Sequence, residues 1–154
     1  MMNETMNQIG WQIESLKKLF KHVSFFSLQQ EIYPGGRTCQ ALLNHIVLLP
    51  EADYRLSQGA TEEEIEQFYL YWEKELTSTE MLEARLDLSF SILKDAYKEL
   101  EPEELAVKTA SYWGTKYNQT EWLLVILTHL SHHRSQLFTF LRTEGEQLDV
   151  QLFE

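Results

Sequence analysis

The sequence predicts an all-α protein, a bundle of four long helices and a shorter one, and three observations support this fold class. Apolar residues recur at spacings of three and four along most of the chain, as they do on the buried face of an amphipathic helix. Ser, Thr or Asn residues followed three positions later by Glu mark the starts of these stretches. No internal repeat or linker divides the chain, so residues 1–154 are expected to form a single domain.

The first expected helix covers residues 5–32, which carry an apolar stripe along one face. The Pro-Gly-Gly turn at 34–36 ends this helix, and Thr38 is placed to cap the next one. That second helix contains Pro50, which lacks a backbone N–H and clashes with the preceding turn. A kink or a stop is therefore expected near Leu49.

Two capping patterns divide the middle of the chain. Thr61 with Glu64 is expected to start a third helix, and Thr-Ser-Thr-Glu at 77–80 repeats the form before a long fourth helix. That helix should stop near Pro102, which cannot continue a helical hydrogen-bond pattern. Residues 103–118 are the longest stretch without helical periodicity, and we expect an irregular loop rich in aromatic residues there.

The last helix is expected to begin at Asn118, with Glu121 completing its cap, and to run to Gly145. Beyond it, apolar and polar residues alternate over positions 147–152. This alternation suggests a short extended segment that docks on the bundle or on a partner.

Composition and charge argue against several function classes. The chain has 13 Lys and Arg against 24 Asp and Glu, a net charge of −11, so we expect no nucleic-acid partner. No apolar run approaches the ~20 residues needed to cross a bilayer, and the N-terminus lacks the features of a signal peptide. A single cysteine excludes an internal disulfide. A cytoplasmic protein without a membrane partner is therefore expected.

The stretch 128–137 carries most of the functional information, because it holds three of the five histidines. His129 and His133 are four residues apart and so lie one turn apart on the same face of a helix. Two imidazoles in this arrangement can bind one metal ion, and His45, in another apolar helical stretch, is the best candidate for the remaining ligand. One divalent ion explains both rings of the pair, whereas each would otherwise need its own hydrogen-bonding partner.

His129 could instead pair with His132, which lies three residues from it. His132 could replace His133 or point to solvent, and the four-residue spacing is favoured because it places the rings more nearly parallel. No Glu-x-x-His or His-Glu-x-x-His pattern occurs, which counts against di-iron bundles and zincin proteases. Cys39 is not on the helical face of His45, so we interpret it as a packing residue.

Two further groups of residues have open interpretations. Loop aromatics can line the mouth of a substrate site or simply cover the end of a bundle: Tyr112, Trp113 and Tyr117. A ligand imidazole normally donates a hydrogen bond from its other ring nitrogen to a nearby acceptor. Three residues near His45 could be that acceptor: Asn44, Glu51 and Asp53.

Residues 129–137 (HLSHHRSQL), followed by Leu141-Arg142 and Gly145, resemble the closing helix of DinB-like (YfiT-like) metalloenzymes. That family typically shows H-x-x-x-H-R-G-Q-L there, with another histidine in an L-x-x-H-I-like context in the second helix. Residues 42–46 (LLNHI) match this second element in type and in order. The resemblance spans the full length through helix order and spacing, and its specificity rests on the two motifs. Ser135 stands where glycine is usual, which affects helix packing or pocket shape rather than the ligands.

The resemblance implies an up-down-down-up four-helix bundle with His45, His129 and His133 as a metal triad near one end of the bundle. It implies a divalent ion, zinc or nickel, with positions left open for water or substrate. Family members with assigned activity are mostly transferases or isomerases that use low-molecular-weight thiols such as bacillithiol or mycothiol.

We therefore expect a metal-dependent S-transferase, or a related transferase or hydrolase, acting on a small-molecule electrophile with a thiol or water. The chemistry is coherent, because an open divalent site produces a nucleophile near neutral pH. The alternative is a non-catalytic stress-related metal-binding or interaction protein with the same bundle. The family resemblance and the many aromatic residues on amphipathic helices also suggest a homodimer.

Overall fold

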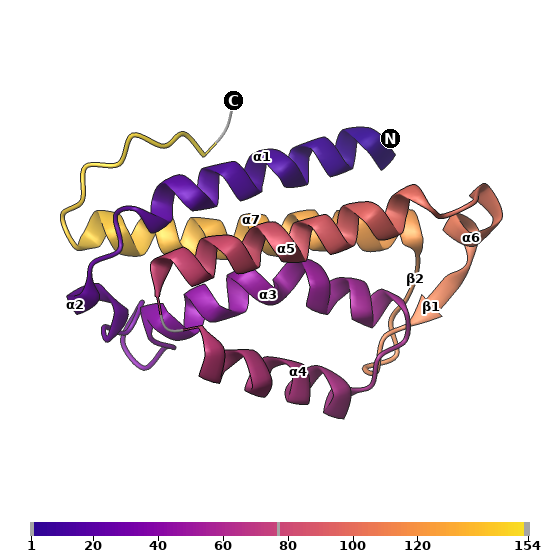
Figure 1. Cartoon of the computed structure of the whole chain (residues 1–154), viewed down its shortest axis with the longest axis horizontal. Coiled ribbons are helices and arrows are strands. Elements are labelled where there is room, and N and C mark those ends of the chain that lie inside the picture. The colour runs from indigo at the N-terminus through magenta and orange to yellow at the C-terminus, as the bar shows by residue number, and fades with distance from the viewer. Residues whose placement is uncertain (1, 77, 153–154) are drawn as a thin grey trace.

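The computed structural model describes residues 2–76 and 78–152, and these residues are mostly helical (Figure 1). The bundle is made by the long helices α1 (Met2–Phe20), α3 (Cys39–Ser57), α5 (Thr79–Lys98) and α7 (Gln119–Thr143). Shorter elements connect them: α2 (Phe25–Leu28), α4 (Glu62–Glu75), α6 (Pro102–Ala106), β1 (Lys108–Ala110) and β2 (Lys116–Asn118).

The long helices run up-down-down-up, which confirms the expected fold class. In Figure 1, α1 and α7 run from right to left, whereas α3 and α5 run from left to right. Helix α4 makes this order possible, because it carries the chain back along the bundle and lets α5 run parallel to α3. Each long helix packs against two others: α1 and α3 each contact both α5 and α7.

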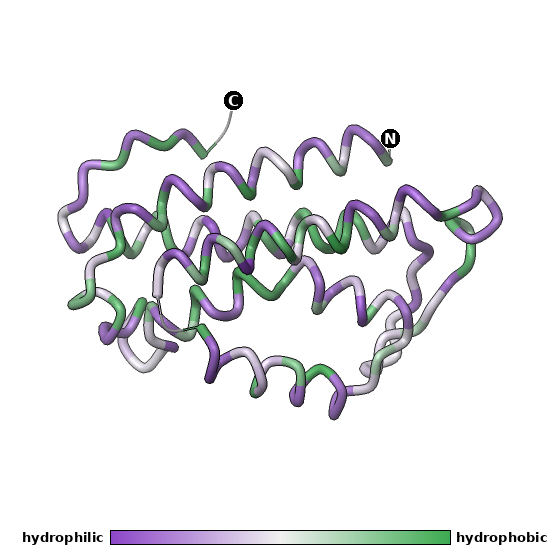
Figure 2. Tube along the Cα trace, viewed as in Figure 1, coloured by the Kyte–Doolittle hydropathy of each residue, from purple (hydrophilic) through white to green (hydrophobic). Residues whose placement is uncertain are grey.

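The core lies between the apolar faces of these helices, and Figure 2 shows the hydrophobic positions following their inner sides. Its central members are almost completely inaccessible to solvent: Ile9, Ile13, Leu16, Leu42, Ile46, Leu86, Leu93, Leu123, Ile126, Leu130 and Leu137. In the tail, Leu148 and Val150 pack against this core, as the alternating pattern predicted. None of the described helices is long and apolar enough to cross a membrane.

Helix α3, which carries one of the candidate histidines, begins where the sequence predicts. The Thr38 side chain accepts a hydrogen bond from the Ala41 N–H, 3.2 Å away, and satisfies one of the free donors at the helix start. The helix does not stop at Pro50 but continues to Ser57. Its ribbon bends near the middle in Figure 1, so of the two expected outcomes the kink is the one observed.

Two helix starts follow the predicted capping pattern closely, and a third is capped one residue later than predicted. The boxes Thr61–Glu64 and Asn118–Glu121 both form with reciprocal hydrogen bonds. Helix α5 is capped by Ser78, whose side chain accepts from the backbone of Met81. Thr77, the first residue of the predicted pattern there, lies outside the described residues.

Two expectations about the elements were wrong. The helix expected over residues 5–32 ends at Phe20, and a separate short helix α2 follows. Ser24 causes the break: in extended conformation, its hydroxyl accepts from the backbone N–H of Ser27 and starts a new helix. The stretch 103–118 is not irregular, because it contains most of α6 and a two-stranded antiparallel hairpin. These elements are too short to produce a visible period in the sequence.

A buried ion pair fixes α4 to the bundle. Glu51 on α3 accepts hydrogen bonds from Arg85 on α5 and from Arg55, whose Nε lies 3.0 Å away. Glu51 and Arg85 are only 5% and 4% exposed, so their charges are almost fully removed from water. The Arg85 guanidinium lies 4.1 Å from the centre of the Trp72 ring of α4, and Arg55 lies 4.6 Å from that of Phe68. The pair therefore joins α3 to α5 and supports α4 through cation–π contacts.

We predict that Glu51→Leu lowers the free energy of unfolding by about 3–5 kcal/mol, because Arg85 loses its buried counter-ion. Urea denaturation followed by circular dichroism measures this change. The double variant Glu51→Leu/Arg85→Met removes both charges and should recover most of the loss. Arg55→Ala is the matched control, since the half-exposed Arg55 side chain should contribute only about 0–1 kcal/mol. A loss below about 1 kcal/mol in Glu51→Leu would contradict the assigned role.

Candidate metal centre

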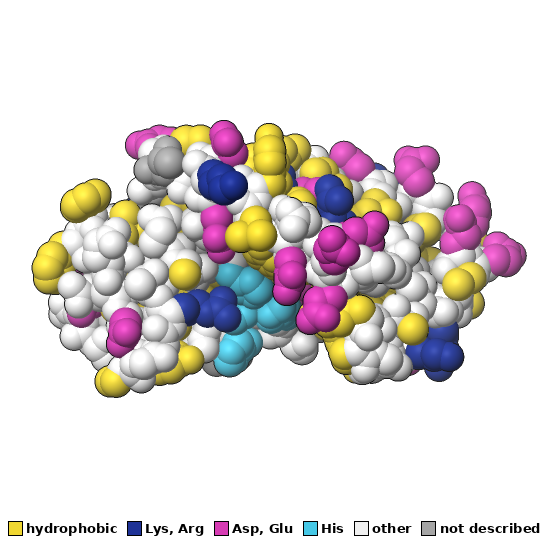
Figure 3. All heavy atoms as spheres, turned by 90° about the horizontal axis from the view of Figure 1, so that it is seen from below, with side chains coloured by type: hydrophobic (Ala, Val, Ile, Leu, Met, Phe, Trp, Pro, Cys, Tyr) yellow, Lys and Arg dark blue, Asp and Glu magenta, His cyan; other side chains and the backbone are white. Residues whose placement is uncertain are grey.

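Three histidines that are far apart in the sequence meet between α3 and α7. His45 of α3 and His129 and His133 of α7 each present a ring nitrogen, and these atoms lie within 4.8 Å of one another. The Nε2 atoms of His45 and His129 are 3.4 Å apart. Histidine side chains gather at one place on the face shown in Figure 3, so the group is reached from the surface. The packing of α3 against α7 therefore brings together the three residues singled out from the sequence.

The two histidines that α7 contributes to the group, His129 and His133, are four residues apart, as predicted. His133 is 6% exposed and joins the group, whereas His132 is exposed and lies outside it, with its ring 4.9 Å from that of His133. The expected position near one end of the bundle was wrong, because His129 and His133 lie close to the midpoint of α7 (Gln119–Thr143). Ser135 is exposed on the same helix and is absent from the cavity beside the histidines described below.

Two of the rings are oriented by a hydrogen bond that their Nδ1 atom donates. His129 donates from Nδ1 to Oδ2 of Asp53 over 2.8 Å, and His133 donates from Nδ1 to Oε1 of Gln136 over 2.8 Å. With the proton on Nδ1, each ring keeps a free lone pair on Nε2. Asp53 lies about two helical turns beyond His45, so α3 supplies both a ring of the group and the partner of another.

Of the three acceptors considered from the sequence, the structure selects Asp53. Asn44 accepts instead from the side chain of Gln40. Glu51 binds the two arginines described above. Gln136 was not singled out from the sequence, although its position three residues after His133 places it on the same helical face and could have identified it.

The donor set suits a divalent ion such as zinc. Two ligand nitrogens bound tetrahedrally at about 2.0–2.1 Å are separated by about 3.3–3.4 Å. The Nε2 atoms of His45 and His129 lie at this separation, 3.4 Å. Nitrogen ligands of the imidazole type fit zinc and nickel equally well, so the donor chemistry does not select between them.

Burial keeps two of the rings neutral. Burial, and then the neighbouring His133 and His129, lowers the pKa of His45 to about 3. Burial also lowers the pKa of His133 to about 4, although its hydrogen bond to Gln136 acts in the opposite direction. The positive charge of Arg37 lowers both pKa values further. Neutral imidazole is the form that can bind a metal ion, so both rings are held in that form at neutral pH.

A cavity of about 320 Å³ lies beside the histidines. Its polar side is formed by His45, His129 and Asp53. The remaining lining, which we call the aromatic pocket, is apolar or aromatic: Ala52, Leu56, Ile65, Tyr69, Tyr112, Trp113, Trp122 and Val125. A small site that combines an apolar wall with a few convergent polar groups is typical of small-molecule binding.

The aromatic lining comes partly from residues expected there. Tyr112 and Trp113 line the pocket, whereas Tyr117 packs against the ring of Trp122, with the ring centres 5.4 Å apart. Tyr69 was not singled out from the sequence, and it stacks on His45 with ring centres 5.3 Å apart. Burial raises the pKa of Tyr69, so its phenol stays protonated and can donate a hydrogen bond.

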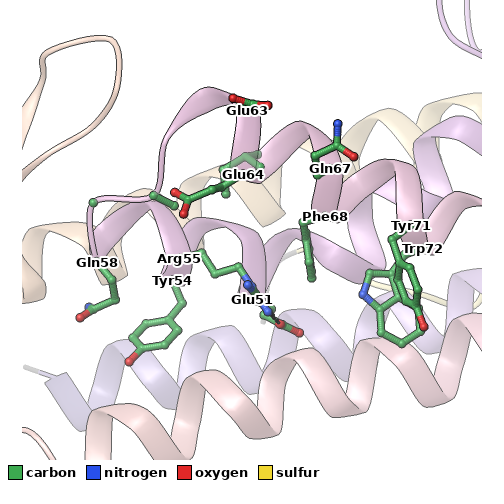
Figure 4. Close-up of a pocket in the computed structure, with 13 residues that line it drawn as sticks. Glu51, Tyr54, Arg55, Gln58, Glu63, Glu64, Gln67, Phe68, Tyr71 and Trp72 are labelled. Carbon is green, nitrogen blue, oxygen red and sulfur yellow. Dashed lines mark hydrogen bonds and ion pairs between the residues drawn. The ribbon is translucent and has the colours of Figure 1, made fainter.

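A larger cleft of about 980 Å³ lies between α3 and α4 (Figure 4). Its described lining contains none of the three histidines. Figure 4 shows the Arg55 guanidinium meeting the Glu51 carboxylate there, and this carboxylate also binds Arg85. The Glu51 and Arg55 charges of this cleft are therefore engaged in holding α4, and the smaller cavity beside the histidines is the candidate functional site.

The fold and the site together define a class of protein: an up-down-down-up helical bundle with three histidines clustered between its second and last long helices. The chain belongs to the DinB family, whose model matches residues 1–149. No curated protein matches the sequence significantly.

Solved structures share this fold. A protein from Exiguobacterium sibiricum described as a DinB-family member superposes with a TM-score of 0.85 at 28% identity, over 99% of this chain and 97% of that one. YfiT from Bacillus subtilis, described as "a probable metal-dependent hydrolase with an unusual four-helix bundle topology", gives 0.76 at 13% identity, over 95% and 89%. A mycothiol-dependent maleylpyruvate isomerase gives 0.67 at 14% identity, over 89% and 60%. At such low identity the last two show the fold alone.

We predict that the metal-free protein loses stability as the pH falls from about 6.5 to about 4. Unfolded histidines titrate near pH 6.5, whereas the folded pKa values of His45 and His133 are about 3 and about 4. Between these values the unfolded state binds more protons, so each ring lowers the free energy of unfolding by up to ~1.4 kcal/mol per pH unit. Urea denaturation in the presence of EDTA at several pH values measures the slope.

The control for this prediction is the double variant His45→Asn/His133→Gln, which keeps every carboxylate of the chain. Its unfolding free energy should fall less steeply over the same pH window. Equal slopes in the variant and the unaltered protein would show that these two rings do not control the acid sensitivity.

Proposed function

We propose that the protein is a divalent-metal-dependent enzyme that transfers or hydrolyses a group of a small molecule. The observation that carries this proposal is the meeting of three imidazoles beside a mainly apolar cavity, with His45 and His129 forming part of its lining. Structural zinc sites are closed by four protein ligands, whereas catalytic sites use three and leave a position for water or substrate. Three protein donors beside a cavity correspond to the second kind.

In this proposal His45, His129 and His133 hold the ion, zinc or nickel. Such an ion, when bound, lowers the pKa of a bound water or thiol and so supplies a nucleophile near neutral pH. Asp53 holds the proton on Nδ1 of His129 and keeps the Nε2 lone pair directed into the group. Gln136 does the same for His133, and Tyr69 stacks on the ring of His45.

The finer proposal is an S-transferase that joins a low-molecular-weight thiol, such as bacillithiol or mycothiol, to a small electrophile. Its support is the shared fold with an isomerase that is described as mycothiol-dependent. Hydrolysis by a water nucleophile is the related possibility, and YfiT, described as a hydrolase, supports it in the same way. Both reactions need the same three histidines and the same open position.

One observation favours the non-catalytic alternative, a stress-related metal-binding or interaction protein. Within the described lining of the cavity, Asp53 is the single carboxylate, and it is bound to His129. It is therefore not free to act as a general base. A metal ion whose remaining position exchanges with added ligands would support the enzyme, and a closed coordination sphere would support the alternative. Association as a homodimer stays a prediction in either case.

We predict that the protein binds one zinc or nickel ion and that His45→Ala or His133→Ala weakens this binding at least about 100-fold, because each removes one of three nitrogen ligands. His132→Ala is the matched control and should retain the ion, since successive helical residues point about 100° apart. Elemental analysis and isothermal titration calorimetry measure both quantities.

Screening the metal-loaded protein for consumption of electrophiles, with and without added thiols, tests the activity itself. The His45→Ala variant provides the blank in that screen. Stoichiometric metal in the double variant His45→Ala/His133→Ala would refute the metal site. Equal losses in His132→Ala and His133→Ala would show that the assigned register is wrong.

We also predict that Asp53→Ala weakens metal affinity by about 10–100-fold without removing any ligand, because the orientation and basicity of His129 depend on this carboxylate. Calorimetric titration with zinc measures the effect. Asn44→Ala is the matched control, since Asn44 is also buried on α3 but bonds to Gln40 rather than to a histidine. Unchanged affinity in Asp53→Ala would leave its hydrogen bond with only a structural role.

A further inference from the structure

The aromatic pocket is assembled from separate elements around the polar side that holds the histidines. Trp122 of α7 is completely buried, and the ring of Trp113, from the turn between β1 and β2, lies 6.4 Å from it. Tyr112 of the same turn meets Trp113 edge-on, with ring centres 4.7 Å apart. Tyr69 of α4 forms another wall and stacks on His45. A ligand that contacts the histidines is therefore surrounded by ring faces and edges.

The two turn residues have surface to offer to such a ligand. Tyr112 is 49% exposed and Trp113 is 52% exposed, although both line the cavity. An apolar group that enters the pocket therefore covers aromatic surface that otherwise faces water, which is favourable by roughly 25 cal/mol for each Å² removed from water. Ring pairs add a further preference for flat groups.

The residues that line the aromatic wall of the pocket disfavour an anionic group there, because the nearby Arg37 is not part of the lining. No Lys or Arg is among its described lining residues, and Asp53 is at its polar side. A neighbouring hollow of about 360 Å³ shares Ile65, Tyr69 and Tyr112 with the pocket and carries Glu62 and Glu66. A carboxylate or phosphate placed against the aromatic wall, away from the ion that the histidines would hold, would lose its hydration without meeting a lining Lys or Arg, and burying such a charge is costly. A neutral apolar group meets no such penalty.

We infer that the substrate carries an uncharged apolar group, at least the size of one aromatic ring, that occupies the aromatic pocket while its reacting bond lies at the histidines. This inference rests on the proposed function and names the substrate class. The volume of about 320 Å³ is near the lower limit for small-molecule sites, which run from ~300 to ~1,000 Å³. Tyr112 and Trp113 set the specificity, because they supply the exposed aromatic surface of the pocket.

The test compares three hydroxamates on the zinc-loaded protein by calorimetry: acetohydroxamate, benzohydroxamate and 4-carboxybenzohydroxamate. All three carry the same zinc-binding head, so differences report on the tail. Benzohydroxamate should bind at least about tenfold tighter than acetohydroxamate, consistent with burial of one ring. The added carboxylate should remove most of that gain.

Variants of the pocket residues show which side chains produce the preference for benzohydroxamate. Trp113→Ala and Tyr112→Ala should each reduce the preference for benzohydroxamate several-fold while leaving zinc and acetohydroxamate affinities unchanged. Trp113→Phe keeps a ring and should retain most of the preference, which separates lost contact from disturbed folding. Tyr71→Ala is the matched control, since Tyr71 is 61% exposed on α4 and lines the larger cleft instead.

The outcomes separate this inference from the proposed function. If zinc binds and the three hydroxamates bind equally, or the carboxylated one binds tightest, the inference is overturned while the proposed metal site stands. An unchanged preference in both Trp113→Ala and Tyr112→Ala would likewise overturn the assigned specificity residues. Failure of zinc or of any hydroxamate to bind would overturn the proposed function, and the inference with it.

Discussion

The packing of α3 against α7 is the contact on which the candidate site depends. It places His45 opposite His129 and His133, and it brings Asp53, two turns further along α3, within hydrogen-bonding distance of His129. Both helices are held by a buried apolar seam that includes Leu42, Ile46, Ile126 and Leu130. Because protein interiors are close-packed, this seam restricts the separation of the rings. The polar group is therefore positioned by apolar contacts on either side of it.

Helix α4 serves both the fold and the site. As the return crossover it lets α3 and α5 run in parallel, and the Glu51–Arg85 pair together with the ring of Trp72 fixes it to them. The same helix supplies Tyr69, which stacks on His45 and forms a wall of the aromatic pocket. A helix that merely reverses the chain direction thus also shapes the cavity.

Much of the fold and the identity of the histidines could be predicted from the sequence, because both depend on local spacing. Capping residues such as Thr61 and Asn118 act on their own helix starts, and the spacing of His129 and His133 places them on one face. What the sequence could not reveal depends on tertiary contact. Apolar periodicity continues through the break at Ser24, the hairpin strands are three residues each, and the choice of Asp53 over Asn44 is decided by which side chain reaches α7. The long-range pairing of Glu51 with Arg85 is of the same kind.

The tautomers of the histidine group give a physical reason for a bound cation. Asp53 and Gln136 fix protons on Nδ1 of His129 and His133, so the Nε2 atoms of both rings present lone pairs. His45 can offer at most one N–H from its own Nε2, which lies 3.4 Å from that of His129. The single Nε2 proton of His45 cannot form full-strength hydrogen bonds to the lone pairs of both His129 and His133. Burial also opposes further protonation, because it lowers the pKa values of His45 and His133. A single divalent ion satisfies all three nitrogens at once, which no arrangement of protons on these rings achieves.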